Sequence, residues 1–449
     1  MRDGSSLTAN STGGGDRADG LTRRQTLQRA AALGAVALLP TGLLEACGGG
    51  SGGGGGTIEF WDMPWGEGKY EAVAKGLVDK FNKQAKTKVS YRLLSWETYY
   101  ETFQTAVSSG ATPAVSTGGT YQGFQYDSSL VDLKPVAEKW EKDGTAKDLI
   151  PGSLEAQYDG SGKLTGLPWN LDIRVLWYRK DLFEKAGITK LPRNLTEIGQ
   201  AAEALTSGNQ AGFGLSGDIL GAQMLLSLFF TNGGGAYNAK GEADLTNKRN
   251  LEVVEWLQGL VNAGAIPKVG AGWQNTDVIA AFERGEIAMM IEEPRVYESM
   301  PSIAKSTQML SPPEGFHGDQ GTIIWHSPVW LYNSAPNKPA TTEFIEWWLA
   351  NQKPLWAEGQ TTSLPARKSF YDIPQLKDPR IKQVLNEWVP IGKLDSAPAP
   401  HPVPSLNAFE GQAFMQTLCQ EIIGLKPAQQ ALETANAALE EVISSTATA

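Results

Sequence analysis

The chain has 449 residues and a formal net charge of −10, with 39 lysine and arginine residues against 49 aspartate and glutamate residues. This acidic balance, without any basic run, argues against a nucleic-acid partner. Three histidines, two cysteines and no HExxH, CxxC, Walker-type or dinucleotide glycine motif lead us to expect neither a metal site nor a cofactor. The length favours two lobes of roughly 200 residues rather than one hydrophobic core.

The N-terminus has the composition of an export signal. Arg23 and Arg24 precede an uncharged stretch over residues 30–44, which contains Pro40. That stretch is too short to span the roughly 30 Å hydrocarbon core of a membrane. Paired arginines before a short apolar segment are typical of a twin-arginine signal peptide. A plain secretory signal followed by a disordered linker is the alternative.

Cys47 closes a segment at residues 44–47, Leu-Glu-Ala-Cys, which resembles the bacterial lipobox. In that motif the cysteine carries the lipid and becomes the mature N-terminus. Only glycine and serine follow up to residue 56, and a flexible tether of this length reaches about 16 Å. We therefore expect a twin-arginine lipoprotein signal peptide at residues 1–46 and a lipidated cysteine with its Gly/Ser tether at residues 47–56.

From residue 57 the chain alternates short apolar runs with amphipathic helical patterns. Strands are predicted over residues 58–61, 89–93 and 114–116, and helices over residues 70–84 and 96–109. This order predicts a mostly parallel sheet with helices on both faces. Ligands of such sheets gather at the carboxyl ends of the strands, which are the loops after Trp61 and Ser116.

A second α/β unit begins near residue 166. Helices are predicted over residues 219–230, 251–263, 344–351 and 428–443, and strands over residues 286–291 and 322–332. The proline-rich stretch at residues 397–404 is typical of an extended surface crossing rather than a domain linker.

Tryptophan is the outlier of the composition, with 14 residues in the chain. Many of them lie beside Gly, Pro, Asp or His rather than in apolar periodic runs, and the candidates are Trp61, Trp65, Trp96, Trp169, Trp273, Trp325 and Trp330. An indole has a wide apolar face and one N–H donor, which suits stacking on the C–H faces of a pyranose.

Residues 162–187 carry the most specific pattern, GKLTGLPWNLD followed by LWYRKDLFEKAG. This segment resembles the hinge-and-helix signature of the maltose-binding-like, family 1 extracellular solute-binding proteins of carbohydrate ABC importers. Further landmarks of that family occur along the chain: Trp96-x-x-Tyr99, Phe282-x-x-Gly285-Glu286, Asn333 to Lys338, Leu364-Pro365-Ala366 and Asp378-Pro379-Arg380. The resemblance covers residues 57–445.

The resemblance implies an α/β protein with the two-lobed, type II periplasmic-binding-protein fold, in which hinge strands join discontinuous lobes around a central ligand cleft. We expect lobe 1 at residues 57–168 plus 326–371, lobe 2 at residues 172–322 plus 378–449, and hinge crossings near residues 168–172, 322–327 and 371–378. A hinge needs a few residues at the ends of elements that absorb the backbone change on closure.

The function implied by the resemblance is capture of a mono- or oligosaccharide between the lobes and its delivery to a membrane permease. The implied partners are the sugar, the transmembrane subunits of an ABC permease, and the membrane through the lipid on Cys47. We expect an exported monomer, anchored at the outer face of the cytoplasmic membrane.

Two acidic residues are candidate partners of sugar hydroxyls. Asp172 falls where members of the family often place a carboxylate, which can accept charge-assisted bonds; otherwise it is a hinge-surface carboxylate. Asp62 ends the first predicted strand, where it either meets the ligand or caps a helix. Trp61 and Trp65 flank Asp62, and we expect one of them to stack on the ligand and the other to lie in the core.

The loop after the third predicted strand contains Gly118, Gly119 and Thr120. Its glycines allow backbone N–H groups to approach a ligand, or they only form a tight turn. At the second crossing, Trp325 and His326 replace the small residues that are frequent in the family, and we expect both side chains to project into the cleft.

The second lobe contributes a polar strand end. Glu292, Glu293 and Arg295 follow the strand predicted at residues 286–291, and they either face the cleft or form a solvated ion pair. Three further candidates rest on family position alone: Asn232, Trp273 and Arg367.

Two other functions stay open at this point. A glycerophosphodiester or polyol phosphate would favour a positive pocket near Arg174, Arg295 or Arg367. A secreted glycosidase would use a carboxylate pair such as Glu292 with Asp172, about 5–9 Å apart. The binding-protein signature explains more residues than a hydrolase does, so we expect no enzymatic activity.

Overall fold

The structure, a computed structural model, describes residues 56–446 apart from residues 67 and 97. The expected signal peptide, the lipidated Cys47 and nearly all of the tether lie outside the described residues. Among those residues, no helix has the length and apolar character that a membrane crossing would require.

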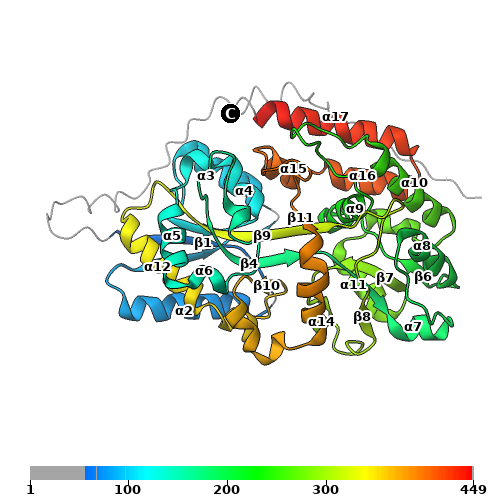
Figure 1. Cartoon of the computed structure of the whole chain (residues 1–449), viewed down its shortest axis with the longest axis horizontal. Coiled ribbons are helices and arrows are strands. Elements are labelled where there is room, and N and C mark those ends of the chain that lie inside the picture. The colour runs from blue at the N-terminus through cyan, green and yellow to red at the C-terminus, as the bar shows by residue number, and fades with distance from the viewer. Residues whose placement is uncertain (1–55, 67, 97, 447–449) are drawn as a thin grey trace, which may run out of the picture. The chain divides into compact units, whose positions relative to one another are not determined.

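One half of the described chain is built on a seven-stranded mixed sheet (Figure 1). Its order is β10-β4-β9-β3-β1-β2, and β11 pairs with β9 off this path. The strands are β1 (Ile58–Asp62), β2 (Val89–Leu93), β3 (Val115–Thr117), β4 (Leu167–Ile173), β9 (Thr322–Leu331), β10 (Leu364–Pro365) and β11 (Gly392–Lys393). β1 pairs in parallel with β2 and β3, as the alternating pattern predicted, whereas β9 runs antiparallel to β3 and β4.

Most helices of this half bury apolar side chains. They are α2 (Tyr70–Gln84), α3 (Tyr99–Ser109), α4 (Thr120–Gln125), α5 (Lys134–Asp143), α6 (Thr145–Asp148), α12 (Lys338–Asn351) and α13 (Pro354–Ala357). Phe81 of α2 and Phe60 of β1 both pack edge-on against Phe344 of α12, with ring centroids 5.0 and 5.4 Å apart.

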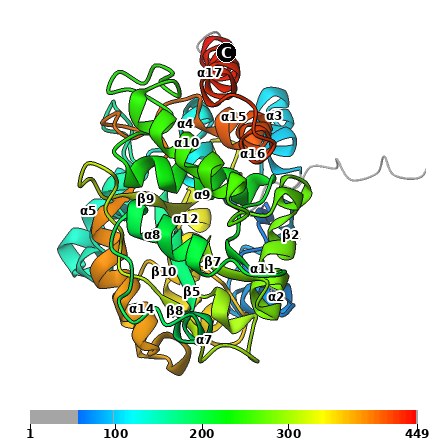
Figure 2. The ribbon, with the colours of Figure 1, turned by 90° about the vertical axis from the view of Figure 1, so that its right-hand side faces the viewer.

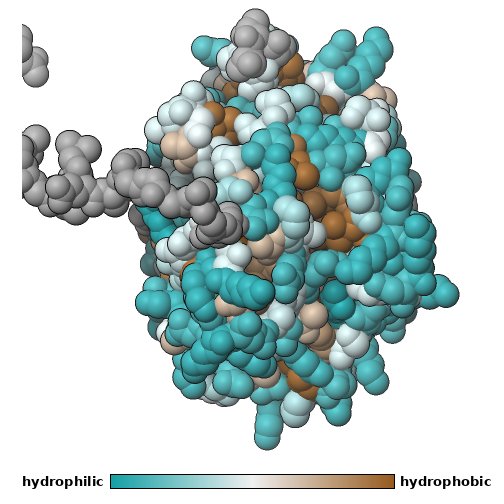
Figure 3. Space-filling model, turned by 90° about the vertical axis from the view of Figure 1, so that its left-hand side faces the viewer, coloured by the Kyte–Doolittle hydropathy of each residue, from teal (hydrophilic) through white to brown (hydrophobic). Residues whose placement is uncertain are grey.

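The face of the molecule in Figure 3 is mostly hydrophilic, with hydrophobic residues in small groups.

The other half is built on a four-stranded sheet of order β6-β7-β5-β8. Its strands are β5 (Val175–Arg179), β6 (Ala211–Phe213), β7 (Ile287–Glu292) and β8 (Thr307–Met309). The helices that follow in the chain are α7 (Lys180–Lys185), α8 (Leu195–Ala204), α9 (Ile219–Thr231), α10 (Lys248–Asn262), α11 (Asn275–Arg284), α14 (Pro379–Gln383), α15 (Leu406–Gly411), α16 (Phe414–Ile423) and α17 (Ala428–Thr446).

The helix α9 is apolar on nearly all sides, which is typical of a helix buried within a protein. It packs against α16 and against β9. In Figure 2, α16 and α17 lie closer to the surface of the molecule than α9 does. Asp218 caps its N-terminus by accepting a bond from the backbone N–H of Gly221.

The chain passes between the two sheets where strands meet end to end. Arg174 alone separates β4 of the larger sheet from β5 of the smaller one. β9 is the longest strand, and its first residue pairs with Gly392 of β11 while its far end pairs with β3. The predicted crossings near residues 168–172 and 322–327 fall on β4 and β9, and the lobe boundaries and hinge positions stay predictions.

Candidate ligand-binding site

A cavity of about 220 Å³ opens where strands from both sheets end. It is lined by Pro64, Trp65, Trp96, Tyr99, Gly119, Asp172, Arg174, Ile219, Leu220, Gln223, Glu293, Trp325, Ser327, Thr362 and Ser363. The first five follow β1, β2 and β3. The others come from β4, the residue between β4 and β5, β9, the first turns of α9, and the residues beside β7 and β10. The carboxyl ends of β1 and β3 are where a parallel sheet places its ligand.

Three aromatic rings form one wall of this cavity. Trp65 packs edge-on against Trp96, with ring centroids 4.9 Å apart at 88°, and Trp96 packs against Tyr99 at 5.6 Å. The indole N–H of Trp65 donates to the hydroxyl of Thr117, and that of Trp96 donates to the carbonyl of Pro64. Edge-to-face packing holds the three rings, and a bonded N–H fixes each of the two indoles, so this wall is formed before a ligand arrives.

Asp62 supports this wall from behind and does not line the cavity. Its buried carboxylate accepts bonds from the hydroxyls of Tyr70, Tyr91 and Thr117. Burial raises the pKa of Asp62 to about 6, against the lowering effect of these bonds. Because Thr117 accepts the bond from Trp65, Asp62 fixes the loop that carries the aromatic ring.

The two tryptophans beside Asp62 have different surroundings. Trp65 lines the cavity, whereas Trp61 lies outside it, packed edge-on against Phe103 at 5.7 Å. The Arg92 guanidinium lies 4.9 Å from the Trp61 ring centroid. The indole N–H of Trp61 donates to Glu59. Of this pair, the geometry favours Trp65 as the stacking surface.

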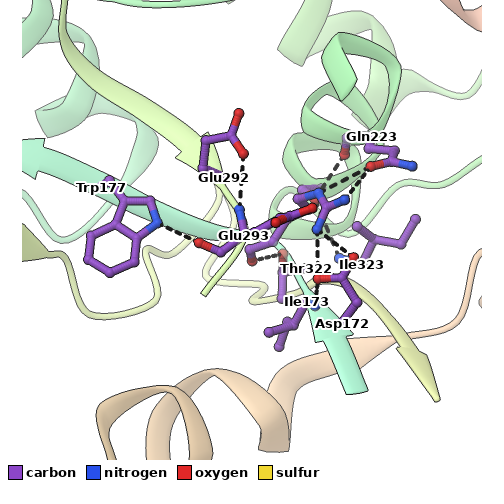
Figure 4. Close-up of polar contacts among 10 residues, drawn as sticks. Asp172, Ile173, Trp177, Gln223, Glu292, Glu293, Thr322 and Ile323 are labelled. Carbon is purple, nitrogen blue, oxygen red and sulfur yellow. Dashed lines mark hydrogen bonds and ion pairs between the residues drawn. The ribbon is translucent and has the colours of Figure 1, made fainter. Parts of the chain in front are cut away.

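A buried ion pair forms the floor of the cavity. Nη1 of Arg174 donates to both carboxylate oxygens of Asp172 at 2.9 Å, and Nε and Nη2 donate to Oε1 of Gln223 at 3.1 and 2.6 Å. Figure 4 shows Asp172 and Gln223 among these polar contacts. The guanidinium also lies 4.9 Å from the ring centroid of Trp325. Arg174 is only 3% exposed, so its charge is matched by protein groups rather than by water.

Glu292 and Glu293, at the end of β7, have different environments (Figure 4). Glu293 lines the cavity, and its carbonyl accepts the indole N–H of Trp177 at 3.0 Å. Glu292 is fully buried outside the lining. Burial first, and the neighbouring charge of Glu293 second, raise the pKa of Glu292 to about 8, so this carboxyl is mostly protonated at pH 7.

Trp325 and His326 lie on opposite faces of β9, because successive side chains of a strand alternate. Trp325 lines the cavity, while Nδ1 of His326 lies 3.1 Å from the hydroxyl of Ser153. Burial lowers the pKa of His326 to about 4, so its imidazole is neutral at pH 7.

The glycines after β3 also divide. Gly119 lines the cavity, but its N–H donates to Oε1 of Gln122, which favours the turn interpretation. Gly118 lies against the Trp330 ring, where a Cβ atom would approach within 2.4 Å, so close packing requires glycine here. Thr120 begins α4, and its side chain lies outside the described atoms.

Four further candidates lie away from the cavity lining. Arg295 is 1% exposed and donates to Glu298 and to the carbonyl of Thr361. Asn232 caps the end of α9 and bonds the backbone of residues 249 and 316. Trp273 follows a short helical turn at Lys268–Gly272. The Arg367 guanidinium lies over the ring of Trp140 and 3.8 Å from Asp148.

Several residues that line the cavity were not among the sequence candidates. They are Tyr99, Gln223, Ser327, Thr362 and Ser363, with Pro64, Trp96, Ile219 and Leu220. Trp96 carried a sequence signal, because it stands outside an apolar periodic run. Ser363 had none, since only the pairing of β10 with β4 brings its segment to the floor.

The comparisons with known proteins agree with this architecture. The sequence model of one protein family, described as bacterial extracellular solute-binding protein, matches residues 65–353. A sugar transporter of Arthrobacter chlorophenolicus A6, solved with bound laminaribiose, is 31% identical; the match covers 86% of this chain and 99% of that one, with a TM-score of 0.79.

Two curated relatives match over shorter lengths. A binding protein of Brucella abortus is 24% identical over 269 residues, which are 58% of this chain and 63% of that protein. The sn-glycerol-3-phosphate-binding periplasmic protein UgpB of Rhizobium meliloti is 26% identical over 214 residues, 44% of this chain and 49% of that protein. The matched region thus spans less than two thirds of each of these relatives.

Two α/β halves with a cavity at their strand ends define a two-lobed solute-binding fold, which confirms the predicted fold class. The chain belongs to the family of bacterial extracellular solute-binding proteins.

Glu292 gives a pH test of the region beside the cavity. Because its folded pKa lies well above that of an unfolded glutamate, the native state keeps a proton that the unfolded chain releases between about pH 4.5 and pH 8. This group therefore lowers the free energy of unfolding as the pH rises through that window, by about 1.4 kcal/mol per pH unit.

In Glu292→Gln this dependence is absent, so the variant should gain stability relative to the wild type between pH 5 and pH 8, by up to about 3 kcal/mol. Urea unfolding of both proteins at the two pH values measures the difference. Glu255→Gln, at an exposed position of α10, is the control. A difference for Glu292→Gln that stays constant with pH would contradict a protonated, buried carboxyl.

Proposed function

We propose that this protein captures a neutral sugar in the cavity and delivers it to a membrane permease of the ABC type. The observation that carries the proposal is an aromatic wall facing a polar floor whose charges are already matched. Trp65 and Trp325 offer apolar faces for the C–H groups of a pyranose. Asp172, Gln223 and Ser327 offer oxygen and nitrogen atoms for its hydroxyls.

The proposed ligand class is a glucose disaccharide or short oligosaccharide, with laminaribiose as the first candidate. The support is that the Arthrobacter sugar transporter, 31% identical, was solved with that disaccharide.

The charge of the cavity favours a neutral ligand over a phosphate ester. A glycerophosphodiester or polyol phosphate needs a cation that can bond its oxygens. Arg174 is bonded to Asp172 and Gln223, and Arg295 is bonded to Glu298. Arg367 lies outside the lining, so the likeness to UgpB carries less weight than the cavity itself.

The same geometry favours binding over hydrolysis. A glycosidase places one protonated and one ionised carboxyl on either side of the scissile bond. Here Asp172 is held by Arg174, and the protonated Glu292 lies outside the lining. We therefore propose that incubation with oligosaccharides produces no new reducing ends while the same mixtures show binding.

A ligand panel tests the proposal. Laminaribiose, other glucose disaccharides, monosaccharides and sn-glycerol 3-phosphate would be screened by thermal shift and then by calorimetry. A ligand that binds only the native state raises stability by RT ln(1 + [L]/Kd), so a sugar should raise the melting temperature and the phosphate should not. A shift with sn-glycerol 3-phosphate and none with any sugar would overturn the proposal.

Trp65→Ala should weaken sugar binding by roughly 30-fold or more, because truncating an aromatic anchor at the centre of a site typically costs about 2 kcal/mol. Trp347→Ala is the matched control, since Trp347 is also half-buried but lies on α12 outside the cavity. Calorimetry measures Kd, and circular dichroism checks folding. A folded Trp65→Ala protein with wild-type affinity would show that this ring is not the stacking surface.

We also propose that the protein is exported and held at the outer face of the membrane by lipid on Cys47. The support is the sequence pattern of residues 23–56 together with membership of an extracellular family. Cys47→Ala should release the protein from membrane fractions, and replacement of Arg23 and Arg24 by lysine should block export. Membrane association of Cys47→Ala equal to that of the wild type would exclude the lipid anchor.

A further inference from the structure

We infer that Asp395 and Glu410 are positioning residues of the sugar site, which share one proton and hold Trp325 in the geometry that receives the ligand. The inference rests on the proposed function for the nature of the ligand. Neither carboxyl lines the cavity, and both act through side chains that do.

Asp395 lies just beyond β11 and is 3% exposed. Its Oδ2 accepts the indole N–H of Trp325 at 2.9 Å. Since the Arg174 guanidinium lies over the same indole ring, one contact fixes the edge of Trp325 and the other covers a face. The ring that meets the sugar is therefore oriented by Asp395.

Glu410 lies in α15 and is 7% exposed. Its carboxyl is hydrogen-bonded to that of Asp395, and it lines a small hollow together with Gln223. A carboxylate only accepts hydrogen bonds, so two carboxyls can bond each other only while one of them keeps its proton. Burial, and then the charge of Asp395, raise the pKa of Glu410 well above its ordinary value, which favours its protonated form.

These contacts form a chain, which we call the buried polar chain: Glu410, Asp395, Trp325, Arg174 and Gln223. Trp325 donates to Asp395, and Asp395 is bonded to Glu410. Gln223 accepts from Arg174, and Arg174 lies over Trp325. Three members line the cavity, and a change at either carboxyl reaches the ligand through Trp325.

The groups around the carboxyl pair would stabilise a second negative charge only weakly. Arg174 is the cation whose charge attracts the Glu410 carboxylate. The charge of Arg174 is already balanced by its ion pair with Asp172, and Glu292 and Glu293 also attract it. Burial, with the charges of Asp395 and Glu410 as lesser causes, raises the pKa of Tyr237, so this phenol stays neutral.

The helices packed against α15 add no countercharge to the pair. On α3, Tyr100 packs against Gly411, and beside α4, Tyr126 accepts a bond from Asn407. The side chains that α17 buries are apolar: Ala431, Leu432, Ala435, Leu439 and Val442. Loss of the shared proton therefore separates Asp395 from Glu410, and the position of Trp325 loosens with it.

The test compares Glu410→Gln with Glu410→Ala by titration with laminaribiose between pH 6 and pH 10. In Glu410→Gln the amide donates to Asp395 without a titrating proton, so affinity at pH 7 should stay within about threefold of the wild type and should not fall at high pH. Glu410→Ala should bind about tenfold or more weakly at every pH. The affinity of the wild type should fall as the pH rises. The affinity of Glu433→Gln, the control at an exposed position of α17, should fall in the same way.

A measurement without ligand separates this inference from the proposed function. The infrared C=O band of protonated carboxyl groups at pH 7 should be weaker in Glu410→Gln than in the wild type, whether or not the protein binds laminaribiose. No binding by the wild type, with this band change present, would overturn the choice of sugar and leave the proton-sharing pair supported. Equal bands in the two proteins, or a Glu410→Gln affinity that falls with pH as the wild type does, would overturn the inference.

Discussion

The buried charge of Arg174 is the constraint on which the rest of this structure depends. An arginine that is only 3% exposed loses its hydration, a penalty of several kcal/mol, and it is tolerated only with partners on every side. Asp172 supplies the countercharge and Gln223 accepts the remaining guanidinium donors. The same residue separates β4 from β5, so the ion pair lies where the chain leaves one sheet for the other.

The backbone of Arg174 is tied to β9 as firmly as its side chain is tied to the floor. Its N–H donates to the carbonyl of Ile323 at 3.2 Å, and its carbonyl accepts the hydroxyl of Thr322 at 2.6 Å (Figure 4). The start of β9 therefore lies beside the crossing, and Trp325 follows in the same strand under the guanidinium. One buried cation thus sets the strand crossing, the floor of the cavity and the place of an aromatic ring.

Local patterns predicted the elements and the strand ends well, because burial and alternation are encoded in neighbouring residues. The loops after β1 and β3 do supply Trp65 and Gly119 to the cavity, as the parallel order of these strands implied. The same patterns could not tell that two tyrosines capture the Asp62 carboxylate, since Tyr91 lies 29 residues away in the chain. Strand alternation could have separated Trp325 from His326, because adjacent residues of one strand face opposite sides.

Residues that reach the cavity through pairing of distant segments had no sequence signal. Gln223 is drawn to the floor by Arg174, 49 residues earlier, and Ser363 arrives because β10 pairs with β4. Asp395 and Glu410 had even less sequence signal. They lie together because β11 pairs with β9 and α15 packs on α4. Long-range pairing of this kind is what a single sequence conceals.

A crystal structure of the protein grown with laminaribiose tests the central claim most directly. The account predicts the disaccharide in the cavity, with a pyranose face against Trp65 and the Arg174–Asp172 ion pair intact. Sugar bound elsewhere on the protein, or a ligand that takes Arg174 away from Asp172, would contradict it.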